Sequence, residues 1–199
     1  MTDEVREPDH EGDPEPIAAP ARYDTVASDT VASDTVAAAL LDRFAGSIFF
    51  SSHGQSVVYL ERAQLAEAAQ YLRDEEQFTM CVDVTAVDHL VDGVRHAAPG
   101  VATERFEIVA NFLSHTRNRR VRVICEVPES DPTVPSLTGV YPGTEFAERE
   151  TFDLFGIRFD GHPDLTRILM PDDWVGHPLR KDDPSARVPV TFKGDPRPR

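Results

Sequence analysis

The sequence predicts an α/β (α+β) fold, in which a small mixed sheet is flanked by two or three helices and followed by a long extended C-terminal segment. Segments whose apolar residues recur every three or four positions indicate helices, and segments rich in β-branched or alternating apolar residues indicate strands. The third observation is the density of proline, because seven of the 16 prolines follow Gly156. Proline donates no backbone hydrogen bond, so we expect no long helix and no central strand after that point.

These patterns divide the chain into an acidic tail (residues 1–34), an α/β domain (35–156) and an extended C-terminal segment (157–199) that wraps a partner. The tail holds ten Asp and Glu residues against two Arg and has few large apolar side chains, so we expect it to be disordered. It ends in a tandem TVASD repeat, Thr25–Asp29 and Thr30–Asp34. Two copies are too few for a repeat fold, and we interpret them as a replication slip in a solvated tail.

The elements of the α/β domain follow from the same two periodicities. The helices are predicted at Thr35–Ala45, Arg62–Leu72 and Thr144–Phe155. The strands are predicted at Ser47–Ser51, Ser56–Leu60, Phe78–Val87, Glu104–Leu113 and Arg119–Val127. The first two strands are joined by a turn at His53-Gly54-Gln55, and the last two are predicted to form a hairpin.

Charge and hydropathy exclude several classes of protein. The net charge is −15 and the pI is about 4.7, and a surface of that sign repels phosphate backbones. We therefore expect no nucleic-acid binding. No apolar run approaches the roughly 18 residues that could span a bilayer. The acidic N-terminus also lacks the basic start and apolar stretch of a signal peptide, so we expect the chain to stay in the cytoplasm.

The cysteines and glycines do not suggest a cofactor. Cys81 and Cys125 stand 44 positions apart, outside any C-x-x-C pair, whereas an iron–sulfur cluster normally needs four thiolates. Neither of the two common glycine-rich nucleotide motifs is present. We expect both thiols to be small apolar groups inside strands. Four histidines without ligand-like spacing are expected to be surface or cap residues: His53, His89, His96 and His115.

The stretch from Glu148 to Pro184 carries the most specific pattern in the chain, EREtfDLFGIrFdGHPDLtRILMPDDWvGHPLRKDDP. Its core elements are E-R-E, D-x-F-G-I, G-H-P-D-L, R-I-L and G-H-P-L-R-K-D. Together they closely resemble the signature of the thirty-kilodalton subunit family of complex I, known in bacteria as the C subunit of NADH-quinone oxidoreductase. The signature and interface residues that this resemblance implies are Glu148, Arg149, Glu150, Asp153, Gly156, His162, Pro163, Arg167, His177, Pro178, Arg180 and Lys181.

The resemblance continues upstream more weakly. Asp83–Asp88 resembles the family's D-[IL]-T-A-V-D strand, Arg105–Val109 its R-F-E-V-V strand, and Pro135–Thr138 its P-S-[VL]-T step. It covers roughly residues 40–185 and leaves the acidic tail outside. One departure precedes Glu148, where the family commonly has an aromatic residue such as Trp and this chain has Gly143-Thr144-Glu145-Phe146-Ala147.

The resemblance implies a structural subunit of a proton-pumping NADH:quinone oxidoreductase. In this family an extended segment wraps along the neighbouring quinone-site polypeptide, the D subunit, among the other peripheral-arm subunits. The family member itself holds no cofactor, so FMN, iron–sulfur clusters and quinone belong to partner subunits, and no residue of this chain is expected to be catalytic. The chain is then a peripheral protein on the cytoplasmic side of the cell membrane, touching the membrane only through its partners.

Two alternatives stay open. Related subunits occur in membrane-bound [NiFe] hydrogenases and in deazaflavin-dependent dehydrogenases, and the absence of a fused D-subunit sequence favours the NADH enzyme. The carboxylates and imidazoles of the signature are also typical metal ligands. His162 and His177, however, are 15 residues apart and each precedes a proline, so we expect no metal site. Instead we expect these groups to pair with the nearby cations, namely Arg149, Arg158, Arg167, Arg180 and Lys181.

Arg149 is the residue that we expect to anchor the interface. In the predicted helix it stands four residues from Glu145 and four from Asp153, so its guanidinium is expected to bond carboxylates in both directions. Arg167 is expected to be a second anchor. Because prolines deny residues 158–184 a hydrogen-bond ladder of their own, we expect this stretch to gain its order from a partner.

Overall fold

The computed structural model describes residues 35–92, 95 and 97–184. The tail expected at residues 1–34, with its TVASD repeat, lies outside the described residues. The same holds for His96 and for the end of the extended segment beyond residue 184.

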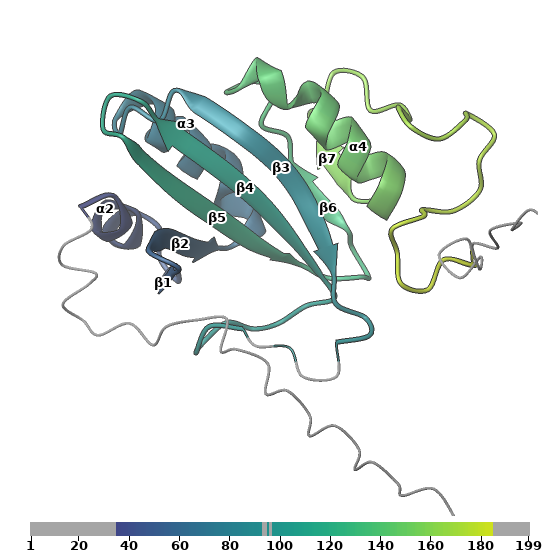
Figure 1. The fold of residues 1–199 in the computed structure, drawn as a ribbon, viewed down its shortest axis with the longest axis horizontal. Coiled ribbons are helices and arrows are strands. Elements are labelled where there is room, and N and C mark those ends of the chain that lie inside the picture. The colour runs from purple at the N-terminus through teal and green to yellow at the C-terminus, as the bar shows by residue number, and fades with distance from the viewer. Residues whose placement is uncertain (1–34, 93–94, 96, 185–199) are drawn as a thin grey trace, which may run out of the picture.

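Within these ranges, five strands form the main sheet in the order β1-β2-β5-β4-β3 (Figure 1). The strands are β1 (Ile48–Ser52), β2 (Gln55–Leu60), β3 (Met80–Asp88), β4 (Phe106–Ser114) and β5 (Arg119–Val127). β2 and β5 run parallel and the other neighbours run antiparallel, so the sheet is mixed, as predicted. The predicted hairpin of the last two strands is the β4–β5 pair.

Three helices of the described chain pack around this sheet, at the predicted places. They are α2 (Thr35–Arg43), α3 (Leu65–Asp74) and α4 (Glu145–Phe155); single 3-10 turns, η1 (Arg62–Gln64) and η2 (Pro142–Thr144), precede the last two. Figure 1 shows α4 beyond β3, at the edge of the sheet. The hydroxyl of Thr151 in α4 lies 3.3 Å from the carbonyl oxygen of Val84, so the helix covers the open edge of β3. The predicted fold class is confirmed.

A second, two-stranded sheet was not predicted. β6 (Thr133–Pro135) pairs in parallel with β7 (Arg158–Asp160), which belongs to the segment expected to be extended. Ile157 and Phe159 point into the core and are at most 3% exposed. Three-residue strands are too short for the alternation that identifies a strand in the sequence. The start of the C-terminal segment is therefore part of the domain's own core.

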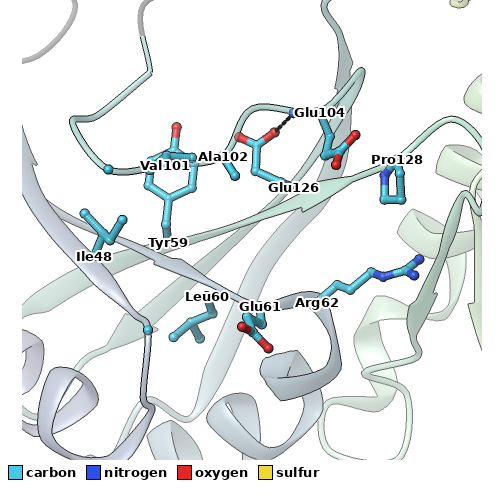
Figure 2. A pocket seen from close by; sticks show the side chains of 12 residues that line it. Ile48, Tyr59, Leu60, Glu61, Arg62, Val101, Ala102, Glu104, Glu126 and Pro128 are labelled. Atoms are coloured by element: carbon cyan, nitrogen blue, oxygen red, sulfur yellow. Dashed lines mark hydrogen bonds between the residues drawn. The ribbon is translucent and has the colours of Figure 1, made fainter.

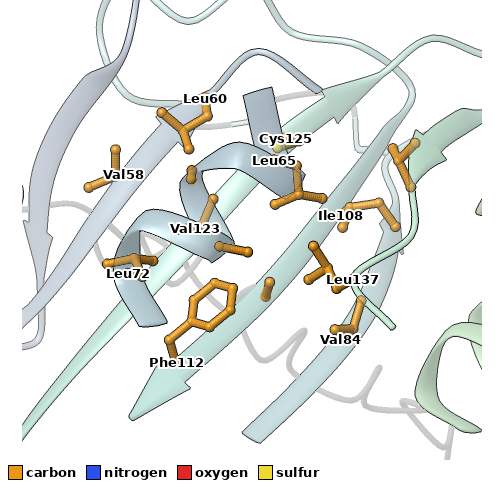
Figure 3. Packing of buried hydrophobic residues seen from close by; sticks show 14 of the residues in the cluster. Val58, Leu60, Leu65, Leu72, Val84, Ile108, Phe112, Val123, Cys125 and Leu137 are labelled. Carbon is orange, nitrogen blue, oxygen red and sulfur yellow. The ribbon is translucent and has the colours of Figure 1, made fainter. Parts of the chain in front are cut away.

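The main core lies between the sheet and the helices (Figure 3). The helical face predicted for α3 is buried, because Leu65 and Leu72 are almost fully covered, as are the two alanines between them. Opposite them, β4 and β5 present alternate residues such as Ile108 and Val123. Cys125 is buried in this core, and burial raises the pKa of its thiol. Cys81 is half-buried, and burial raises its pKa to about 12, which keeps the thiol protonated.

The opposite face of the sheet carries a smaller cluster and one exception to the prediction for histidines. His53 and His115 are exposed, as expected. The side chain of His89, in contrast, is only 9% exposed and lies 3.2 Å from Glu107 and 3.0 Å from Asp92. The residue as a whole is half-buried, and its imidazole is largely covered by carboxylates from β4 and from the turn after β3.

Within the described ranges, no helix is both long enough and apolar enough to cross a membrane.

Candidate functional site

The signature residues gather around α4 and the chain that follows it, which we call the strap (residues 157–184). Two acidic residues in the first turn of α4, Glu145 and Glu148, favour the helix start. The helix ends at Gly156, whose φ of 74° is a left-handed conformation that glycine adopts easily. A Cβ added there would lie 2.6 Å from the His177 ring, so the strap also approaches too closely for a side chain.

The strap caps the C-terminal end of α4. The last carbonyl groups of a helix have no partner within it and must find donors elsewhere. Here His177 Nδ1 donates to the carbonyl of Asp153 (2.9 Å) and the backbone N–H of Leu179 to that of Leu154 (3.0 Å). Arg180 Nε donates to the carbonyl of Phe155 (2.7 Å). The G-H-P-L-R element is thus a helix cap supplied from a distant part of the chain.

The carboxylate of Asp153 holds the middle of the strap. One oxygen accepts from Arg167 at 2.6 Å. The other accepts the backbone N–H groups of three consecutive strap residues at 2.8–3.0 Å, which are Ile168, Leu169 and Met170. Burial opposes ionisation of this fully covered carboxyl, but these hydrogen bonds outweigh burial and lower its pKa to about 2. The expected pairing of a signature carboxylate with Arg167 is therefore present.

Arg149 does not make the ion pairs that the helical spacing predicted. Its Nε donates to the carbonyl of Thr166 (3.1 Å) and its Nη2 to the carbonyl of Arg167 (3.0 Å). Asp153, four residues on, is already engaged by the strap. The prediction was wrong because helical spacing identifies neighbours on one helix face, whereas the guanidinium turns to backbone acceptors that only the fold brings near. Arg149 still anchors the strap, but through carbonyl groups.

Glu148 also departs from the expected pairing with a cation. It is fully buried, and its carboxylate accepts from Ser136 Oγ (2.6 Å), the N–H of Leu137 (2.8 Å) and the hydroxyl of Thr144 (2.8 Å). Ser136 and Leu137 belong to the upstream P-S-L-T step. Two separate parts of the sequence pattern therefore meet at one carboxylate, and sequence spacing did not indicate this contact.

The first G-H-P turn is fixed to the beginning of α4. His162 Nε2 lies 3.1 Å from the carbonyl oxygen of Glu145, and its Nδ1 accepts the N–H of Asp164 at 3.0 Å. The ring thus bridges the start of α4 and the backbone of its own turn. The adjoining Pro163 is exposed, as is Glu150 on the outer face of α4.

The end of the strap is tied to the main sheet. The N–H of Lys181 donates to Asp88 (2.8 Å), and Arg105 bonds both Asp88 (3.0 Å) and Asp182 (2.6 Å). Burial opposes ionisation of Asp88, but its bonds to Arg105 and to backbone N–H groups lower its pKa. Asp183 accepts the N–H of His177 (2.7 Å). Asp88 and Arg105 belong to the two upstream strand patterns of the family. Their place in these patterns was the only feature of the sequence that pointed to the contact between the strap and the sheet.

The strap shows apolar side chains on its outer side. Those exposed by more than a third include Ile168, Leu169, Trp174, Val175 and Leu179. Val175 is 92% exposed, although valine is usually buried. Some polar groups of the strap, such as Arg167 and His177, are turned toward the domain. The apolar groups named above face outward, together with exposed carboxylates such as Asp172 and Asp173.

A separate pocket of about 420 Å³ lies between the β1–β2 pair and the chain that precedes β4 (Figure 2). Two of its charged groups are already bonded, because Glu126 accepts the N–H of Glu104 (2.8 Å) and Arg62 bonds Asp131 (2.6 Å). None of the signature residues lines it. Across the described ranges, no group of three His, Cys, Asp or Glu side chains is arranged to hold a metal ion.

Most of the described chain lies within a region that matches one known protein family. The family described as "Respiratory-chain NADH dehydrogenase, 30 Kd subunit" matches residues 58–188. The chain belongs to this family. All the signature residues named above lie inside the matched range, so α4 and the strap are part of what this respiratory-chain family shares.

Individual relatives agree with this assignment. The chain is 47% identical over 143 residues to the NADH-quinone oxidoreductase C subunit of Nocardioides sp. strain JS614, covering 71% of this chain and 54% of that protein. It is 47% identical over 139 residues to the C subunit of Mycobacterium avium strain 104, covering 69% and 55%. The chain thus spans about half the length of the curated relatives that it matches.

Two solved structures are similar in fold. A trypsin-resistant fragment (1–134) of Nqo5 superposes with a TM-score of 0.53 at 32% identity, covering 60% of this chain and 90% of the fragment. A chain of an archaeal membrane-bound sulfane sulfur reductase superposes with a TM-score of 0.53 at 19% identity, covering 81% and 95%. At that identity the second likeness shows the fold alone.

Proposed function

We propose that this chain is a structural, cofactor-free subunit of the peripheral arm of a proton-pumping NADH:quinone oxidoreductase. In this assembly it packs against the quinone-site polypeptide, the D subunit, and supports electron transfer from NADH to quinone without taking part in it. FMN, iron–sulfur clusters and quinone belong to the partner subunits. The chain sits on the cytoplasmic side of the membrane and reaches it only through those partners.

The observation that carries this proposal is the two-sided strap. Backbone and side-chain groups on its inner side bond to α4 and to the main sheet, and its outer side exposes Leu169, Trp174 and Val175. Exposed apolar groups that gather on one segment are typical of a protein–protein interface. Aromatic residues such as Trp174 contribute strongly to such interfaces. A partner polypeptide is the natural cover for this surface.

The bonds of the strap favour a rigid docking element. The sequence favours a stretch that receives its order from the partner, whereas hydrogen bonds of Asp153, Arg149 and Arg105 within the chain support a strap that is ordered beforehand. A segment ordered beforehand loses less conformational entropy on binding, which strengthens association. The signature residues therefore act before assembly, by shaping the surface that the partner meets.

The same bonds support a structural role for these polar residues. The carboxylate of Asp153 accepts four hydrogen bonds, and that of Glu148 accepts three. A general acid or base needs access to the reacting group, whereas both carboxylates are fully buried. The isolated chain is accordingly expected to be colourless and inactive, and a stoichiometric flavin or iron spectrum would contradict the proposal.

A charge placed on the strap tests the proposed interface. Val175→Asp puts a carboxylate on the most exposed apolar residue of the strap, so the amount of assembled complex should fall severalfold. The melting temperature of the isolated chain should stay unchanged, because Val175 is exposed. Val91→Asp is the matched control, since Val91 is 68% exposed but lies after β3. Normal assembly of the Val175→Asp chain, measured by native gel electrophoresis, would exclude the strap as the interface.

The alternative assemblies, a membrane-bound [NiFe] hydrogenase or a deazaflavin-dependent dehydrogenase, differ in their other subunits. Affinity purification of the tagged chain from detergent-solubilised membranes should recover a D-subunit polypeptide together with an NADH-binding flavoprotein. Recovery of a [NiFe] subunit or a deazaflavin-binding subunit instead would assign the chain to one of those enzymes.

A further inference from the structure

The turn between β4 and β5 concentrates positive charge in an otherwise acidic chain. Four arginines lie within residues 117–122, and the sequence has no Asp or Glu between Glu107 and Glu126. His115, Arg119 and Arg120 are all exposed at this turn. The whole chain has a net charge of −15, so this turn is a local exception that attracts anions.

A second turn completes a cleft beside it. β2 pairs in parallel with β5, with Ser56 opposite Val121, so the β1–β2 turn lies next to the β4–β5 turn. The two turns enclose an open cleft of about 500 Å³, whose lining includes Gly54, Gln55, His115, Asn118, Arg119 and Arg120. The segment from Ser47 to Leu60 carries no charged residue, so the β1–β2 side adds no carboxylate.

Both turns have backbone conformations that hold this shape. His53, Gly54 and Asn118 have φ values of 52°, 74° and 49°, as tight turns require. The nearby cations differ in what they already bind: Arg117 pairs with Glu76 (2.6 Å) and Arg122 donates to Asn111 (3.1 Å). Arg120 makes no ion pair with any residue in the described ranges. The cleft thus offers guanidinium, imidazole and amide donors to a carboxylate.

We propose that this cleft binds carboxylates of the acidic N-terminal segment of the same chain, residues 1–34. That segment holds ten Asp and Glu against two Arg, a net charge of −8, which complements the cleft. The two copies of the TVASD repeat end at Asp29 and Asp34, and Asp24 precedes them at the same interval of five residues. Each copy of the repeat therefore contributes one aspartate, and these aspartates compete for a single binding site.

The length of the segment allows this contact. α2 begins at Thr35, so Asp24 is eleven residues away, and an extended chain of that length spans roughly 36 Å. That distance is about the diameter of a small domain. Because the segment is tethered, its effective concentration at the cleft is on the order of millimolar, which offsets the weakness of exposed ion pairs. In the free chain the segment shields the basic turn from other anions.

Zero-length cross-linking of the full-length chain tests this proposal. Carbodiimide joins lysine amines to adjacent carboxylates, and the chain has only two lysines, Lys181 and Lys193. In the Arg120→Lys chain we expect the new amine to couple to Asp24, Asp29 or Asp34, as identified by mass spectrometry of the digested monomer. The yield should fall by about fivefold in about 0.5 M NaCl, because salt screens exposed charges. Arg158→Lys places an exposed amine on β7 as the control and should not couple to these residues.

The results of these measurements distinguish the N-terminal segment from other possible occupants of the cleft. The proposal is overturned if residue 120 couples to no carboxylate of residues 1–34, or if the control couples equally well. Coupling found only in cross-linked dimers would move the contact to a second copy of the chain and would also overturn it. Binding of the intact chain to vesicles of one part phosphatidylglycerol to three parts phosphatidylcholine, lost in the Arg119→Gln/Arg120→Gln chain, would identify a lipid headgroup as the occupant instead. All these measurements use the free chain and are independent of the proposed complex.

Discussion

His177 Nδ1 donates a hydrogen bond to the carbonyl oxygen of Asp153, 2.9 Å away and 24 positions earlier in the chain. The carboxylate of Asp153 meanwhile accepts three backbone N–H groups from another part of the strap. One residue of α4 is therefore bonded to the strap through both its backbone and its side chain. The last turn of the helix and the strap stabilise each other, and neither forms this geometry alone.

Gly156→Ala should destabilise the isolated chain by about 3 kcal/mol. A left-handed alanine costs about 1–2 kcal/mol, and its Cβ would collide with the His177 ring, which adds about 1–3 kcal/mol unless the ring leaves its bond to Asp153. Gly54→Ala is the matched control, because Gly54 has the same φ of 74° but nothing within 4 Å of the added Cβ. Urea denaturation should give a clearly larger loss for Gly156→Ala; equal losses would contradict the close approach of His177.

Asp153→Asn should cost about 3–5 kcal/mol, because the amide places an N–H₂ group among donors and leaves the partly buried Arg167 without its counter-charge. The measurement is the free energy of unfolding by urea. Glu150→Gln, an exposed substitution on the same helix, should change it by less than about 0.5 kcal/mol. A loss below about 1 kcal/mol for Asp153→Asn would show that the carboxylate does not hold the strap.

The same carboxyl should make stability depend on acidity. Its pKa is lowered from 3.8 to about 2 in the folded chain, so its contribution of roughly 2 kcal/mol is complete above about pH 4. The contribution is lost as the pH falls from 4 toward 2, where the folded form must also bind the proton. Urea denaturation at several pH values should show this loss of unfolding free energy. In the Asp153→Asn chain the unfolding free energy should lack this part of its dependence on pH.

Arg149→Lys should weaken the strap almost as much as Arg149→Ala. The guanidinium reaches two neighbouring carbonyl groups from two nitrogens, which a single ammonium group does not reproduce. We expect a loss of about 1–2 kcal/mol and a smaller amount of assembled complex. The turnover of the complex that still forms should be unchanged. Normal assembly with collapsed turnover would instead indicate a direct role of α4 in the reaction.

Amide hydrogen exchange tests whether the strap is ordered before assembly. The N–H groups of Ile168, Leu169 and Met170 bond a buried carboxylate, so they should exchange more slowly than that of the exposed Gly54 in the free chain. His177→Ala should accelerate exchange at Leu179, whose N–H caps the same helix end. Equally fast exchange along the whole strap of the free chain would restore the original expectation that order comes from the partner.

The order of elements was predictable because local patterns specify it. The periodic apolar residues of α3 and the alternation in β5 identified both elements, and the predicted hairpin is the β4–β5 pair. The end of α4 at Gly156 was also predictable, because glycine readily adopts the left-handed conformation that caps a helix. The pairing of β6 with β7 could not be predicted, because strands this short show no periodic pattern. The two strands also lie far apart in the sequence, on either side of α4.

The sequence by itself determined the fold class, the helices and strands of the main sheet layer, and the family, since these depend on periodicity and on residues at fixed spacing. Only the tertiary structure decided which partner each signature residue has. Helical spacing favoured carboxylates for Arg149, but the strap offers two carbonyl groups that no local pattern records. Glu148 likewise meets Ser136 because the fold brings the two segments together. Hydrogen bonds between distant segments depend on three-dimensional position, and position follows from the packing of the whole core.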